Sequence, residues 1–147
     1  MPDRKFVCNL SNRMTELDKL TRFIEESGEK LCLPQKCMFE INLALEEVFS
    51  NIVNYAFTDN KAHTVKVVIN AHKSKLSLSV EDDGRPFNPL TAAPPLLATD
   101  LEDCSVGGIG IHLIRRLMDD VRYTRRSDRN ELTLIRKKRP DVSSCPV

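Results

Sequence analysis

The chain has 147 residues, of which 41% are hydrophobic and 29% are charged, as in an ordinary soluble globular protein with one hydrophobic core. Its 22 Lys and Arg residues balance 21 Asp and Glu residues, so the net charge predicts no general attraction to nucleic acid or to an anionic membrane. It shows no signal-peptide pattern and no apolar run of membrane-spanning length, and we therefore expect a cytoplasmic protein with no membrane or direct nucleic-acid partner.

The N-terminal part predicts a strand followed by a helix. Lys5 to Leu10 is a short candidate strand, and Ser11 is suited to cap the helix after it. One face of this helix carries Leu17, Leu20, Thr21 and Ile24. Gly28 suits the end of the helix, because glycine is common just beyond a helix C-terminus.

The segment from Glu40 to Phe57 carries the strongest helix pattern. Neither Gly nor Pro interrupts it, and Pro34 precedes it near the first turn, where proline is tolerated. Apolar residues recur at steps of three and four, at Met38, Ile41, Leu45, Val48, Ile52 and Ala56. Glu47, Asn51 and Asn54 project together beside this stripe, at about 100° per residue. They form either a simple solvated face or a place where a carboxylate and two carboxamides act together.

Two alternating segments follow, Thr64 to His72 and Leu76 to Val80, and their short connection predicts an antiparallel hairpin. The second strand leads into an acidic turn, EDDGRPFNP. Leu90 to Val106 contains prolines and acidic residues that oppose a helix, and we predict a long mobile loop, which is either a functional lid or a disordered insertion.

The C-terminal third predicts a helix and two strands. Gly107, Gly108 and Gly110 precede an apolar-periodic helix, and the strands Asp120 to Arg126 and Glu131 to Lys137 follow. The pattern predicts one α+β domain over residues 1–137, a two-layer sandwich with helices on one face of a mostly antiparallel sheet. Residues 138–147 are predicted to be a disordered tail.

Two of these segments are typical of nucleotide binding. The run GGIGIHLIRRLM resembles a phosphate cradle, because glycines allow close approach of the backbone and the helix start presents unpaired N–H groups. The alternative is a helix entry that needs only conformational freedom. Asp82 can accept a hydrogen bond from an exocyclic amine and Gly84 leaves room for a planar ring, or the pair is part of an ordinary charged turn. Neither a Walker A loop nor a Rossmann fingerprint is present.

Taken in order, the ExxxN helix, the DxGxxFxP turn and the GGxGxxLI helix entry resemble the N, G1 and G2 boxes of the GHKL ATPases, which share the Bergerat ATP-binding fold. The resemblance is closer to the serine/threonine-kinase anti-sigma factors of bacterial partner-switching systems, and it covers Lys5 to Lys137. It departs from the pattern of these families at Tyr55, Pro86 and Asn88, and the segment Leu90 to Val106 holds no Lys or Arg.

The resemblance implies ATP and Mg²⁺ as cofactors and assigns a role to each motif residue. Glu47 would be the general base for a Ser or Thr hydroxyl, and Asn51 would bind Mg²⁺. Asp82 would bind the adenine amino group with support from Gly84. Gly108 and Gly110 would line the phosphates, and Thr133 would lie near the base. In place of a lid cation, the candidates for the γ-phosphate are Arg85, Arg115 and Arg116.

The implied function is a homodimeric anti-sigma kinase that sequesters a sigma factor and phosphorylates an anti-anti-sigma protein of the STAS type. A non-catalytic nucleotide-binding module that interacts with the same partners is the main alternative. A structural α+β domain with accidental motif matches is a third. The sequence identifies neither the particular partners nor the regulated process.

Overall fold

The computed structural model describes residues 4–88 and 108–137. Its elements in chain order are β1 (Arg4–Ser11), the short 3₁₀ helix η1 (Met14–Glu16), α1 (Leu17–Lys30), α2 (Gln35–Tyr55), β2 (Thr64–Ala71), β3 (Lys75–Asp82), α4 (Gly108–Leu117), β4 (Asp120–Arg126) and β5 (Arg129–Lys137). The predicted lid, Leu90 to Val106, and the predicted tail, residues 138–147, lie outside the described residues.

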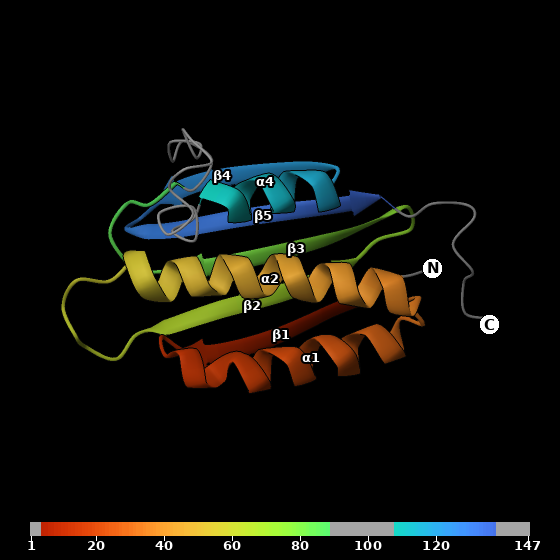
Figure 1. Cartoon of the computed structure of the whole chain (residues 1–147), viewed down its shortest axis with the longest axis horizontal. Coiled ribbons are helices and arrows are strands. Elements are labelled where there is room, and N and C mark those ends of the chain that lie inside the picture. The colour runs from red at the N-terminus through yellow and green to blue at the C-terminus, as the bar shows by residue number, and fades with distance from the viewer. Residues whose placement is uncertain (1–3, 89–107, 138–147) are drawn as a thin grey trace.

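The strands form one five-stranded antiparallel sheet in the order β1-β2-β3-β5-β4. Helices α1, α2 and α4 lie over one face of this sheet, so the molecule has two layers (Figure 1). The predicted α+β sandwich is confirmed. Among the described residues, no helix combines the length and the apolar character that a membrane span requires.

The core lies between the helices and the sheet. Alternate residues of the strands point into it, as Val67, Leu78 and Leu134 do, and all three are fully buried. From the helical layer, Leu45 and Phe49 of α2 are also fully buried. The same alternation continues to the ends of β3 and β5, where the residues on the helix side are Asp82 and Asn130, both buried. The sheet therefore places polar side chains at the edge of its own core.

The start of α4 is predicted after Gly110, but α4 already begins at Gly108. Both predicted boundaries of α1 are also wrong. Ser11 does not cap α1 because it ends β1, and its backbone N–H and hydroxyl both donate to the carboxylate of Glu16. Gly28 lies inside α1, which continues to Lys30. A Cβ at Gly28 would lie 2.2 Å from the sulfur of Met38, so this glycine allows α1 and α2 to pack closely.

The last hairpin turns at Ser127 and Asp128, which both have positive φ. Such tight turns match the twist of antiparallel strands and fix their register. The register places Arg125 of β4 beside Asn130 of β5, and Asn130 beside Asp82 of β3. One cross-strand row thus contains a guanidinium, a carboxamide and a carboxylate.

Candidate functional site

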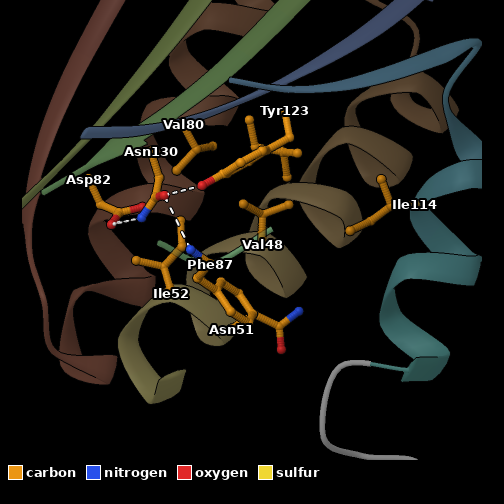
Figure 2. A pocket seen from close by; sticks show the side chains of 10 residues that line it. Val48, Asn51, Ile52, Val80, Asp82, Phe87, Ile114, Tyr123 and Asn130 are labelled. Carbon is orange, nitrogen blue, oxygen red and sulfur yellow. Dashed lines mark hydrogen bonds between the residues drawn. The ribbon is translucent and has the colours of Figure 1, made fainter. Parts of the chain in front are cut away.

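A small pocket lies between α2 and the strands β3, β5 and β4 (Figure 2). Its lining is mostly apolar and comprises Val48, Asn51, Ile52, Val80, Asp82, Phe87, Ile114, Tyr123, Asn130 and Leu132. The free volume is about 10 Å³, which is enough for about one water molecule. A ligand larger than water therefore requires side chains of the lining to move.

Asp82 lies at one end of this pocket and is only 2% exposed. Its Oδ1 accepts hydrogen bonds from the backbone N–H of Gly84 at 2.8 Å and from Nδ2 of Asn130 at 3.0 Å. Burial raises the pKa of this carboxyl, and the two hydrogen bonds oppose the rise. Asp82 is therefore a desolvated carboxylate with one oxygen already fixed by the protein.

Asn130 is the centre of the hydrogen-bond network around Asp82 (Figure 2). It is 3% exposed, and its Nδ2 also donates to the backbone carbonyl of Arg85 at 2.8 Å. Its Oδ1 accepts from the Tyr123 hydroxyl, from Nη1 of Arg125 at 3.2 Å and from the backbone N–H of Phe87 at 3.3 Å. Asn130 thus joins β4, β5 and the turn after β3.

Gly84 brings that turn against the end of α2. A Cβ at Gly84 would lie 2.4 Å from the carbonyl oxygen of Ala56, which is closer than a Cβ atom can approach a backbone oxygen. The same carbonyl accepts a hydrogen bond from the N–H of Arg85 at 2.8 Å, and Nε of Arg85 donates to the carbonyl of Tyr55 at 2.8 Å. In this arrangement the glycine serves the packing of the turn on α2.

His63 holds the turn from its other side. Nδ1 lies 3.0 Å from an oxygen of Asp83, and Nε2 lies 2.9 Å from both oxygens of Asp59. The imidazole stacks on Phe57, with ring centroids 4.5 Å apart. The hydrogen bond to Asp59, together with the negative charges of both aspartates, raises the pKa of His63 against a smaller opposing effect of desolvation. Protonation of His63 therefore strengthens the link between the α2–β2 loop and the turn after β3.

Glu47 and Asn51 lie on α2, one helical turn apart, as the motif predicts. Asn51 is 5% exposed and lines the pocket, with its carboxamide apart from the group around Asp82 (Figure 2). Burial raises the pKa of Glu47, and a side-chain hydrogen bond from Asn51 opposes the rise. Glu47 and Asn51 are therefore neighbours one turn apart on α2, whereas Asn54 is exposed to solvent.

The remaining predicted residues lie elsewhere. Gly108 and Gly110 are in the first turn of α4, and α4 packs against α2. Thr133 of β5 does not line the pocket, because its side chain lies on the sheet face opposite Leu132 and Leu134. Alternation of those two leucines already indicates this orientation. The position of β5 that lines the pocket is Leu132, one residue earlier.

Sequence reasoning missed Asn130 and Tyr123. The tight turn at residues 127–128 predicts that Arg125 and Asn130 are paired across β4 and β5. The local sequence therefore indicates one of the two pairings in the cross-strand row of Arg125, Asn130 and Asp82. The pairing of Asn130 with Asp82 joins positions 48 residues apart, and no local pattern specifies it.

The chemical groups that line the pocket are of the types that bind an adenine nucleotide. A buried carboxylate with a free oxygen suits an exocyclic amine, apolar walls suit a planar ring, and the Asn51 carboxamide is an oxygen ligand of the sort that Mg²⁺ takes. Within residues 4–88 and 108–137, no cluster of three or more His, Cys, Asp or Glu could hold a metal ion.

Known proteins similar to this chain are named as kinases. A serine/threonine-protein kinase BtrW of Bordetella bronchiseptica is 33% identical over 103 residues, which are 70% of this chain and 72% of that kinase. A serine-protein kinase RsbW of Listeria innocua is 31% identical over 87 residues, 56% of this chain and 55% of its own length. The RsbW of Bacillus subtilis is 26% identical over 92 residues, 60% and 58% of the two chains.

The sequence also matches a domain family over nearly all of the sandwich. The matched residues, 10–136, run from the end of β1 to the end of β5 and include the α2 pair, the turn after β3 and the start of α4. The predicted resemblance to the GHKL ATPases and their serine/threonine-kinase branch is confirmed. The chain belongs to the family of histidine kinase-like ATPase domains.

Proposed function

We propose that this protein binds Mg²⁺-ATP in the pocket between α2 and β3, β5 and β4, and phosphorylates a serine or threonine of a partner protein. The placement of Glu47 one turn before Asn51 on α2 carries the proposal, because it sets a carboxylate of raised pKa beside an oxygen ligand that lines the pocket. The names of the similar kinases support the same reaction.

Each residue has one task in this proposal. Asp82 accepts a hydrogen bond from the adenine amino group, and Asn51 binds Mg²⁺. Glu47 accepts the proton of the Ser or Thr hydroxyl, for which a raised pKa makes it a better base. Bound Mg²⁺-ATP supplies the phosphoryl group with part of its charge neutralised, so the protein chiefly positions groups.

The N-terminal end of α4 is proposed to bind the phosphates. Gly108 and Gly110 form its first turn, where backbone N–H groups have no partner within the helix. Arg115 and Arg116 lie in the last turn of α4, and Nε of Arg85 already donates to the carbonyl of Tyr55. We therefore assign the phosphate contacts to the backbone of α4, and Thr133 has no part in the proposal.

The regulatory role is proposed from the family. The protein would act in the cytoplasm as a homodimeric anti-sigma factor, sequestering a sigma factor and releasing it by exchange with a STAS-type anti-anti-sigma protein that it phosphorylates. The lack of Lys and Arg between Leu90 and Val106 favours the alternative of a module that binds nucleotide and partners without catalysis.

Two measurements separate these functions. Calorimetric titration with Mg²⁺-ATP tests binding, and we expect saturable binding to a folded chain. Incubation with γ-labelled ATP and a STAS-type protein captured from the source cell tests transfer, and we expect label on a Ser or Thr of that protein. Binding without transfer to the captured partner would support the non-catalytic module, and absence of both would refute the proposed function.

A further inference from the structure

Asn130 has only one orientation that satisfies its neighbours. Its Oδ1 faces three donors, from Tyr123, Arg125 and the backbone of Phe87. Its Nδ2 faces two acceptors, Oδ1 of Asp82 and the carbonyl of Arg85. Rotating the carboxamide by half a turn would set its NH₂ group against three donors and its oxygen against two acceptors. The network therefore fixes an N–H donor toward Asp82.

This donor determines how Asp82 can act. Both hydrogen bonds to Asp82 fall on Oδ1, so among the described residues its Oδ2 is left for a ligand. The carboxylate is almost fully buried, which favours its protonated form, and the bond from Asn130 is the largest of the effects that oppose protonation. A protonated Oδ2 would donate rather than accept a hydrogen bond.

We propose that Asn130 is a positioning residue that makes Asp82 an acceptor selective for a purine with an exocyclic amino group. The proposal rests on the proposed binding of a nucleotide in this pocket, and it goes further by assigning base selectivity to a residue outside the three motifs. Asn130 acts through Asp82, and Tyr123 and Arg125 act through Asn130.

The chemistry predicts discrimination between an amino group and an oxygen at the same ring position. ATP presents an amino donor to Oδ2, whereas inosine triphosphate presents a carbonyl oxygen, which an ionised carboxylate repels. Loss of the Asn130 donor lets Asp82 rotate and take up a proton, and a protonated Asp82 tolerates the carbonyl. Discrimination then falls even where overall binding persists.

The test measures dissociation constants of the Mg²⁺ complexes of ATP and inosine triphosphate by calorimetry, for the full chain and for Asn130→Ser. We expect the parent to prefer ATP, and the variant to reduce the ratio of the two constants by roughly tenfold, the worth of one hydrogen bond to a charged group. The ATP affinity of the variant should also fall with decreasing pH over a range in which that of the parent stays constant.

Tyr123→Phe provides a milder variant in case Asn130→Ser does not fold. It removes only the hydroxyl that donates to Asn130, and we expect a reduction of the ratio of a few fold, in the same direction. Asn70→Ser is the matched control, since this carboxamide on β2 points to the sheet face opposite the pocket, and its ratio should equal that of the parent.

If Asn130→Ser is folded and its ratio of the two dissociation constants equals that of the parent, the inference is overturned. This holds even if both affinities fall, because a purely structural role affects the two nucleotides alike. If Asn130→Ser is unfolded, an unchanged ratio in Tyr123→Phe overturns it. Failure of the parent to bind either nucleotide would instead refute the proposed function, and the inference with it.

Discussion

Asp82 and Glu47 are both carboxylates whose pKa is raised by burial, yet their surroundings differ. Asp82 is held by Asn130 from another strand and by a backbone N–H of a turn that is itself bonded to α2. The pKa of Glu47 is lowered by Asn51, one turn along its own helix. The Asp82 end of the pocket is therefore built by the tertiary fold, whereas the Glu47 end is built by local helix geometry.

This difference predicts different mutational behaviour at the two ends. A substitution on α2 should alter chemistry with little effect on the fold, because the helix forms from its own apolar stripe. A substitution around Asp82 should lower the free energy of unfolding as well as the binding affinity, because buried polar networks leave several groups unsatisfied when one member is lost.

Glu47→Gln should have the largest effect. It keeps the size and helix propensity of the side chain but removes the base, so phosphoryl transfer should slow by about 10² to 10⁴, with Mg²⁺-ATP affinity nearly unchanged. Label transfer and calorimetry measure the two quantities. Glu46→Gln, at the neighbouring position of α2, is the matched control and should transfer label at the parental rate.

Asn51→Ala separates the two roles on α2. It removes the proposed metal ligand, so metal-dependent nucleotide affinity should fall together with the rate. Full transfer activity in Glu47→Gln would show that the catalytic assignment is wrong, and equal behaviour of the two variants would remove the distinction between base and ligand.

Gly84→Ala should have the next largest effect, and this effect should be on the stability of the fold. Its methyl group would overlap the carbonyl of Ala56, and overpacking of this kind costs roughly 1 to 3 kcal/mol of the free energy of unfolding. Urea denaturation measures the change. Gly28→Ala is an informative comparison because its new methyl group meets a flexible methionine inside a helix, where alanine is intrinsically favoured over glycine. Equal costs at the two positions would contradict the close packing of the turn against α2 as the reason for the glycine at position 84.

The smallest effect concerns His63. Its pKa in the folded protein lies above the ordinary value of 6.5, so the stability it contributes is fully present below that value and is lost as pH rises through the folded pKa. We expect the difference in unfolding free energy between the parent and His63→Gln to shrink as pH increases above about 6.5. Denaturation curves at several pH values measure it. A difference independent of pH would exclude the ionic link to Asp59 and Asp83.

The sequence predicted the order of elements because the periodicity of helices and strands is local. It predicted that Glu47 and Asn51 are neighbours for the same reason, since one helical turn separates them. Asn130 could not be assigned, because its role depends on which strand lies beside β5. The sequence favours a helix end at Gly28, because the contact with Met38 of α2 that requires a glycine there is tertiary and leaves no local pattern.

We propose that Asp82 receives the base of a bound adenine nucleotide, and calorimetric titration of Asp82→Asn with Mg²⁺-ATP tests this role most directly. We predict that the variant stays folded by circular dichroism and binds at least roughly tenfold more weakly than the parent, because an acceptor is replaced by a donor facing an amino group. Asn70→Ser, on the sheet face opposite the pocket, should bind like the parent. Parental affinity in folded Asp82→Asn would contradict the account.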